Sequence, residues 1–207
     1  MALTDLNLAP RWILATLLVA TVLFAGCRSS ADTRDDLATT GGPRLSSDTS
    51  QEGILVERLD ADGNGVIDII RTFELFDDPR EPGRTRRRIK MMELDVNSDG
   101  VINVRRHYDQ YGNVEREEND LNLDGQMDTT LFFAGGELAR KELLANENGA
   151  PRIKERRIYF ENRLVRVERD QNRDGNIDSW EYYEDGVLMR IGRDTVGDGA
   201  ADTWQFR

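Results

Sequence analysis

One short acidic phrase recurs five times, and it constrains the fold more than any other feature of the chain. Numbered from its first Asp, the phrase has oxygen-bearing side chains at positions 1, 3, 5 and 9, glycine at position 6 and usually an apolar residue at position 8. The copies begin at Asp60, Asp95, Asp120, Asp170 and Asp194. Any fold of this chain must therefore repeat one local structure that turns sharply at each glycine.

The spacing of the copies reveals a sixth, degenerate unit. Successive phrases lie about 25 residues apart, but the interval between Asp120 and Asp170 is twice as long. Its midpoint holds residues 144–149, which keep the glycine and contain no Asp. The first interval is lengthened by residues 77–83, a run of turn-forming residues. Residues 53–207 are thus predicted to form a six-unit β repeat domain.

The phrase suits a hard cation such as Ca²⁺, because Ca²⁺ takes six to eight oxygen ligands and a glycine turn can aim alternate side chains at one point. The alternative is that these are structural turns, since Asp and Asn bond their own backbone two residues on. A turn needs only one such residue, so the repeated pattern favours the cation. The candidate metal ligands are Asp60, Asp62, Asn64, Asp68, Asp95, Asn97, Asp99, Asn103, Asp120, Asn122, Asp124, Asp128, Asp170, Asn172, Asp174, Asp178, Asp194, Asp198 and Asp202.

The six units are not expected to bind equally. Val196 replaces the oxygen ligand at position 3 of the last phrase, which predicts weaker binding there. The degenerate unit offers Asn146 and Asn148 but no carboxylate at positions 1, 5 or 9. No ion is expected in that unit.

The segments between the phrases predict strands. Between Gly100 and Asp120 the chain is short and is broken by a turn at residues 109–113, so two helices cannot fit. Comparable turns occur at residues 134–136, 161–162 and 184–186, and the flanking runs interleave apolar residues with charges of both signs. The predicted fold is all-β: repeated antiparallel hairpins form a long twisted or curled meander sheet of about twelve strands, from Ile54 to Phe206, with acidic loops between hairpins.

Aromatic residues follow each phrase at positions 13 and 14. Packing between units is the favoured interpretation, and a stacking platform for a ligand is the alternative. Trp180 and Trp204, at position 11, distinguish the two: exposure side by side favours sugar binding, and burial in the sheet favours a scaffold. The residues are Phe73, His107, Tyr108, Phe132, Phe133, Tyr182, Tyr183 and Phe206.

The amino-terminal segment predicts export and lipid attachment. Arg11 precedes an apolar run, residues 12–24, that ends in Ala25-Gly26-Cys27. This arrangement is typical of a secretory signal, and the run is short for a membrane span. The ending resembles the lipobox of bacterial lipoproteins, which implies that residues 1–26 are a signal peptide and that Cys27 is acylated. A buried thiol is the usual alternative for a lone cysteine, but Cys27 follows a signal and precedes a polar segment.

Residues 27–52 are predicted to be a lipidated flexible tether, because they contain too few apolar residues to offset the entropy of ordering. The lipoprotein resemblance implies a bacterial cell-envelope protein, anchored by its lipid on the extracytoplasmic side. Arg28, where Asp would favour retention in the inner membrane, favours the outer membrane.

The acidic loops resemble those of dockerins, thrombospondin type 3 repeats and EF-hands, which implies Ca²⁺ as the cofactor. The resemblance covers residues 60–206 and is carried by positions 1, 3, 5, 6 and 9. Position 12, where EF-hands place a bidentate acid, holds Arg71, Arg106, Leu131, Glu181 and Gln205. Fewer acidic ligands weaken binding, so affinities in the millimolar range typical of extracellular modules are expected.

No catalytic constellation is apparent, and an enzyme is not expected. The single histidine, His107, has no nucleophile or acid that the sequence places beside it. The net charge of −11 disfavours nucleic acid as a partner. The basic run at residues 84–90 is interpreted as a solvated strand edge, with contact to an anionic polysaccharide or lipid as the alternative.

Two hypotheses for function follow. The first is a calcium-binding, lipid-anchored extracytoplasmic repeat protein that acts as a structural or interaction module. The second is an envelope polysaccharide-binding protein in which calcium only stiffens the frame. The expected partners are the membrane, through the lipid, and an envelope polymer or protein.

Overall fold

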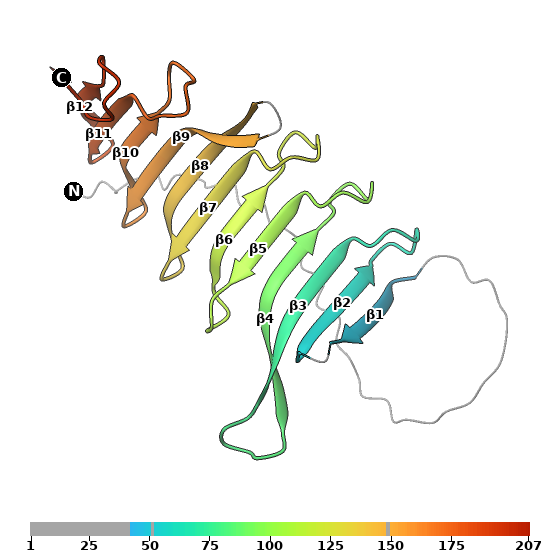
Figure 1. The fold of residues 1–207 in the computed structure, drawn as a ribbon. Coiled ribbons are helices and arrows are strands. Elements are labelled where there is room, and N and C mark those ends of the chain that lie inside the picture. The colour runs from blue at the N-terminus through green and yellow to red at the C-terminus, as the bar shows by residue number, and fades with distance from the viewer. Residues whose placement is uncertain (1–41, 51, 148–149) are drawn as a thin grey trace, which may run out of the picture. The chain divides into compact units, whose positions relative to one another are not determined.

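A computed structural model describes residues 42–50, 52–147 and 150–207. These residues belong to one unit, and its strands build a single antiparallel sheet in sequence order (Figure 1). No helix occurs in the described ranges. The strands are β1 (Arg44–Thr49), β2 (Ile54–Asp60), β3 (Ile69–Asp77), β4 (Thr85–Leu94), β5 (Val104–Tyr108), β6 (Val114–Asn119), β7 (Thr129–Ala134), β8 (Glu137–Glu147), β9 (Ala150–Phe160), β10 (Arg163–Arg169), β11 (Ser179–Glu184), β12 (Val187–Arg193) and β13 (Thr203–Phe206).

The predicted all-β meander is confirmed, with one strand more than the approximately twelve expected. The sheet is open, because β1 and β13 stand at its two ends and do not pair with each other. The additional strand, β1, lies inside the segment predicted to be a tether. All six of its residues are exposed. It is held by its pairing with β2 and by an ion pair from Arg58 to Asp48 (2.7 Å). Pairing with a neighbouring strand, which composition does not reveal, therefore starts the sheet at Arg44 rather than near Ile54.

Tight turns connect the strands at one of their two ends. At Asp185-Gly186 and at Gly135-Gly136 both residues have positive φ, as a two-residue type I′ turn requires. Glu161-Asn162 has the same backbone conformation without glycine. These turns lie where the sequence predicted them. The acidic loops lie at the opposite ends of the strands (Figure 1).

A β-bulge recurs beside positions 13 and 14 in four of the units. The register shifts by one residue between positions 13 and 14 in four hairpins, at Thr72/Phe73, His107/Tyr108, Phe132/Phe133 and Tyr182/Tyr183. A bulge inserts one residue and reverses the face to which the following side chains point. The extra residue lies on the following strand in each case, so the reversal of faces occurs in that strand and not between the two residues at positions 13 and 14. The extra residues are Lys90, Glu115, Ala139 and Met189.

The sheet has almost no buried apolar core. Among the described residues, Phe73 and Val167 are the only large hydrophobic side chains that are buried. Most strand residues are half-buried, because the sheet is a single layer and both of its faces meet solvent. Much of the stabilisation that burial against a second layer normally gives must therefore come from other interactions.

Rows of alternating charges run across the strands. The register places Arg105 between Glu93 (2.9 Å) and Glu118 (3.4 Å), and Arg156 between Glu142 (3.0 Å) and Glu168 (2.8 Å). A further row joins Arg169 to Glu155 (2.7 Å) and Glu181 (2.5 Å). Each cross-strand pair contributes only about 0.2–1 kcal/mol. Their repetition along the sheet fixes which residues face one another.

Arginine side chains also cover aromatic rings of the sheet. The guanidinium carbon of Arg140 lies 3.8 Å from the centre of the Phe132 ring, and that of Arg87 lies 4.7 Å from Phe73. Such contacts combine cation–π attraction with shielding of apolar surface from water. The charged residues that the sequence interleaves with apolar ones thus protect the thin core.

Candidate metal sites in the acidic loops

The five phrases form five loops, all at the same end of the strands. Loop 1 (residues 60–68) joins β2 to β3, loop 2 (95–103) joins β4 to β5, and loop 3 (120–128) joins β6 to β7. Loop 4 (170–178) joins β10 to β11, and loop 5 (194–202) joins β12 to β13. The structure thus places every predicted ligand in one of five equivalent positions along the sheet (Figure 1).

One hydrogen bond is common to all five loops: the glycine at position 6 donates its backbone N–H to the Asp at position 1. The distances are 2.9 Å for Gly65 to Asp60, 2.7 Å for Gly100 to Asp95, 2.8 Å for Gly125 to Asp120, 2.9 Å for Gly175 to Asp170 and 2.7 Å for Gly199 to Asp194. The five glycines have φ between 83° and 96°, which disfavours any residue with a Cβ. Glycine therefore brings its own N–H within reach of the first carboxylate.

Position 9 closes each loop in the same way. Its side chain accepts the backbone N–H of position 2, as from Ala61 to Asp68 (2.6 Å) and from Val96 to Asn103 (2.9 Å). Position 5 accepts the N–H of position 7, as from Val101 to Asp99 (2.8 Å). A carboxylate has about four lone-pair sites. These bonds therefore orient the side-chain oxygens and leave capacity for a cation.

The first Asp of four loops is almost completely buried. Asp60 is 2% exposed, Asp95 and Asp120 are 4% exposed, and Asp170 is 8% exposed. In loop 5 the corresponding Asp194 is only partly buried. A buried carboxylate is costly unless hydrogen bonds or a cation compensate for its lost hydration. The need for compensation is therefore greater in loops 1 to 4 than in loop 5. In loop 5, Val196 also replaces a ligand.

Loop 1 is the place where three carboxylates converge. One oxygen each of Asp60, Asp62 and Asp68 lies within 4.8 Å of the others, and the described residues contain no second group of this kind. In loops 2, 3 and 4 an Asn occupies position 3 and donates from its amide to the Asp at position 5; the distance from Asn97 to Asp99 is 2.9 Å. The amide thus compensates part of the negative charge in those loops.

Hydrogen bonds to Asp68 and Asp194 favour the charged form of these two carboxylates. The N–H of Ala61, with the Ser98 hydroxyl as a second donor, lowers the pKa of Asp68. The N–H of Gly199 lowers the pKa of Asp194 in the same manner. A loop whose carboxylates stay ionised at neutral pH has the charge that a divalent cation requires.

Adjacent loops are linked by the backbone and, in one case, by a side chain. The carbonyl of Asp68 accepts the N–H of Asp95 (2.9 Å), and the carbonyl of Asp178 accepts the N–H of Asp194 (2.9 Å). Ser98 of loop 2 also donates its hydroxyl to Asp68 of loop 1 (2.7 Å). A change in one loop is therefore transmitted first to its neighbour.

The degenerate unit has lost its loop. β8 and β9 continue past the level of the other loops as a long hairpin, in which Asn146 pairs with Pro151. Leu144 occupies position 1 of this unit, because its N–H bonds to the carbonyl of Asp128 (2.8 Å) as the first Asp of a loop does elsewhere. Asn146 is thus an exposed strand residue outside any acidic cluster. Asn148 lies outside the described residues.

The two tryptophans are separated rather than adjacent. Gly192 lies between them in register, and the Trp204 ring covers it so closely that a Cβ there would come within 3.0 Å of the ring. Trp204 also contacts Tyr182, with ring centres 5.9 Å apart, yet remains 42% exposed. Trp180 is half-buried. The arrangement therefore combines packing of Trp204 with partial access to it.

The basic run 84–90 is largely neutralised. Arg86 pairs with Asp78 (2.9 Å), Arg87 with Glu57 (2.5 Å) and Arg88 with Glu74 (2.7 Å). These partners come from β2, β3 and the turn after β3, so the sequence of the run alone does not reveal them. The ion pairs fit a solvated strand and leave little charge for an anionic polymer. His107, on β5, lies 2.8 Å from the guanidinium of Arg116.

Comparison with known proteins does not identify a family. No family model and no curated protein sequence matches the chain. Among solved structures, a GtfA/B complex matches 61% of this chain and 21% of its own, with 19% identity and a TM-score of 0.32. The complex of accessory secretory proteins 1, 2 and 3 of Streptococcus pneumoniae matches 67% and 19%, with 11% identity and a TM-score of 0.23. The chain therefore spans about a fifth of the length of these structures.

The predicted signal peptide and Cys27 lie outside the described residues. Within the ranges that the structure covers, no helix has the length and apolar character needed to cross a membrane.

Proposed function

We propose that this chain is a calcium-binding, lipid-anchored extracytoplasmic repeat protein that acts as a structural or interaction module without catalysis. The observation that carries the calcium proposal is the convergence of Asp60, Asp62 and Asp68 within 4.8 Å in a loop whose hydrogen bonds recur in four others. Three like charges at this distance repel each other, and a divalent cation relieves the repulsion.

The chain itself contains an acidic turn for comparison. Asp109 accepts the N–H groups of Tyr111 (2.8 Å) and Asn113 (2.9 Å), and a single carboxylate suffices to form that turn. Loop 1 has two carboxylates beyond this requirement. Asp170 adds a second argument, because its Oδ1 is buried without a hydrogen-bond partner. A bound cation would satisfy this oxygen.

The test is calorimetric titration and thermal unfolding of the full chain, purified in detergent, with Ca²⁺, with Mg²⁺ and with chelator. A ligand that binds only the folded protein raises the melting temperature by mass action, about 2.7 kcal/mol at a hundredfold excess over Kd. We expect a rise with Ca²⁺ that Asp62→Asn reduces and the control Asp109→Asn leaves intact. Identical melting curves in calcium and chelator would leave the structural-turn interpretation.

The anchor is tested separately. Cys27→Ser is expected to shift the protein from the membrane fraction to the aqueous fraction and to leave the circular dichroism of the sheet unchanged. The reason is that a lipid on Cys27 would lie outside the repeat domain. A variant that remains in the membrane fraction would contradict lipidation at this residue.

Polysaccharide binding remains the second proposal, because Trp204 and Phe206 are 42% and 73% exposed on neighbouring positions of β13. Sugars bind by stacking on such rings. Pull-down on purified envelope glycan by the unaltered chain, lost in Trp204→Ala and retained in chelator, would support it. Retention by Trp204→Ala equal to that of the unaltered chain would exclude this surface.

A further inference from the structure

The loopless hairpin leaves a gap beside loop 4. β9 pairs with β10 as far as Glu155 and Arg169, and Asp170 then donates its N–H to the carbonyl of Lys154 (3.1 Å). Beyond this bond β9 continues along β8, while the chain after Asp170 turns into loop 4. A cavity of about 290 Å³ lies here, lined by Asn146, Arg152 and Lys154 from the hairpin and by Asp170 and Arg173 from the loop.

Positive charge predominates in this cavity. Arg152, Lys154 and Arg173 line it together with one acid, Asp170, so three positive side chains and one negative side chain leave a net charge of +2. None of the three basic residues forms an ion pair within 4.0 Å with any residue that the structure describes, whereas the arginines of neighbouring rows are paired. Arg152 lies near enough to Asp174 to help lower the pKa of that carboxyl, so Lys154 and Arg173 are the less compensated charges. Unpaired cations in a partly enclosed cavity concentrate positive potential there.

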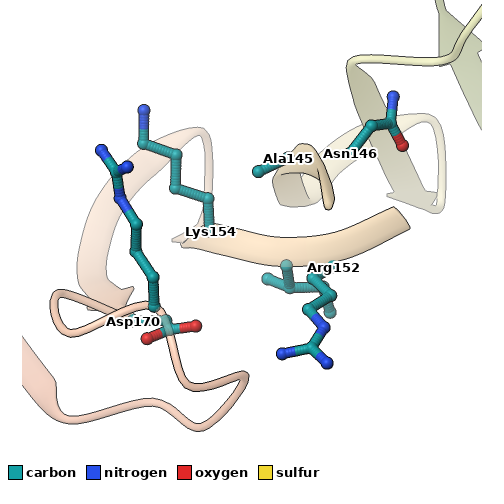
Figure 2. A pocket seen from close by; sticks show the side chains of 7 residues that line it. Ala145, Asn146, Arg152, Lys154 and Asp170 are labelled. Atoms are coloured by element: carbon teal, nitrogen blue, oxygen red, sulfur yellow. The ribbon is translucent and has the colours of Figure 1, made fainter. Parts of the chain in front are cut away.

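Asp170 does not neutralise these residues by direct contact. Its Oδ2 accepts the N–H of Gly175 (2.9 Å), and its Oδ1 is buried without a partner. Figure 2 shows Asp170 across the gap from β9, with Arg152 and Lys154 leaving the strand in opposite directions. Positive charge therefore borders the gap on both sides of β9.

Arg152 is held in place before any ligand arrives. One of its terminal nitrogens donates to the carbonyl of Asp174 (3.3 Å), and the same atom lies so near Gly175 that a Cβ there would come within 3.0 Å. A guanidinium has five N–H donors. An anchored Arg152 therefore keeps donors for a ligand at a reduced entropic cost.

We propose that this cavity binds a small ligand through an oxyanion, a carboxylate or a phosphate group. Arginine matches both groups by bidentate hydrogen bonding, and lysine adds a point charge. The volume lies at the lower limit of ordinary ligand sites, about 300–1,000 Å³, which fits a ligand of the size of one acidic sugar. The site arises because the degenerate unit has no loop to fill the gap, and it does not depend on calcium in the other loops.

The test is calorimetric titration of the full chain in detergent with glucuronate, glucose 6-phosphate, inorganic phosphate and neutral glucose, after calcium has been stripped with chelator and the chelator, itself a carboxylate, has been removed by dialysis into calcium-free buffer. Removal of calcium separates the result from the calcium proposal. We expect the three anions to bind and glucose not to bind. Tighter binding of glucose 6-phosphate than of phosphate would show that the sugar contributes, and equal binding would show that the oxyanion alone is recognised; both outcomes support the site.

Variants locate the site. Lys154→Gln and Arg173→Gln are each expected to weaken anion binding at least fivefold, about 1 kcal/mol. Leu123 occupies the position of Arg173 in loop 3 with the same backbone conformation, so an uncharged residue is tolerated there. Arg163→Gln, which removes an equal charge from an exposed turn, serves as the control and should change binding less than twofold. Absence of binding, or equal loss in Arg163→Gln, would overturn the proposal.

Discussion

Loop 1 and the β8–β9 hairpin occupy equivalent places in two units of the repeat, one intact and one degenerate. Loop 1 has Asp60 at position 1 and folds around its carboxylate, whereas the hairpin has Leu144 there and continues as two strands. The hairpin nevertheless keeps the backbone bond between units, because Leu144 donates its N–H to the carbonyl of Asp128 as Asp95 of loop 2 does to the carbonyl of Asp68. The difference teaches that glycine at position 6 is not sufficient for a loop, because the degenerate unit retains Gly149 but has no carboxylate at positions 1, 5 or 9.

The consequences for charge are opposite. Loop 1 gathers three carboxylates within 4.8 Å, and the hairpin leaves Arg152 and Lys154 without ion-pair partners among the described residues. Loss of one acidic loop thus replaces a candidate cation site with a candidate anion site. Three substitutions test the comparison, from the largest expected effect to the smallest.

Asp60→Ala should have the largest effect. The substitution removes the acceptor of the N–H groups of Gly63 (2.6 Å) and Gly65 (2.9 Å), and hydrogen bonds to a charged group contribute about 1.5–3 kcal/mol each. We expect the amides of loop 1 to lose at least tenfold in hydrogen-exchange protection, measured in chelator. Leu144→Ala, at the same position of the hairpin, should affect its neighbours less, because no backbone N–H depends on that side chain. Equal effects would show that position 1 does not organise the loop.

Gly65→Ala should have an intermediate effect. Gly65 has φ 95°, and no atom lies within 4 Å of the point where the added methyl group would stand, so the substitution measures backbone strain alone. The expected cost is about 1–2 kcal/mol for a residue with a Cβ in the left-handed region. Chemical denaturation of the full chain checks the value, and Gly42→Ala, which is exposed and has no such φ, is the control. A neutral Gly65→Ala would mean that the glycine is dispensable in the loop as well.

Ser98→Ala should have the smallest effect, and the effect should depend on pH. Ser98 helps to lower the pKa of Asp68 in the folded protein. A depressed pKa stabilises the protein above the unfolded-state pKa, and this contribution is lost as pH falls through the folded-state pKa. The variant should therefore melt below the unaltered protein at pH 7, and the difference should diminish at pH 3.

Thermal unfolding of Ser98→Ala at the two pH values provides the measurement. Ser47→Ala, on the exposed strand β1, is the control and should show no pH-dependent difference. A constant difference between pH 7 and pH 3 would show that Ser98 does not act through the Asp68 carboxylate.

Much of the fold could be predicted because its signals are local. The turns at Gly135-Gly136 and Asp185-Gly186 combine residues that adopt positive φ, and the acidic phrases fix the other connections. The strand β1 was missed because its six exposed residues have no apolar pattern and depend on pairing with β2. The calcium ligands, the lipid anchor and the partners stay predictions.

The sequence by itself determined the period, the order of the strands and the residues that each loop presents, because these follow from the conformational preferences of neighbouring residues. Only the tertiary structure decided which charges meet. Strand pairing brings Arg87 to Glu57, thirty residues away, and so helps to neutralise the basic run 84–90, for which contact with an anionic polymer had been the alternative. The same register leaves Lys154 and Arg173 beside an unfilled gap. Electrostatic contacts depend on the distance between charges in space. Strand pairing sets these distances, and they cannot be read from the order of residues along the chain.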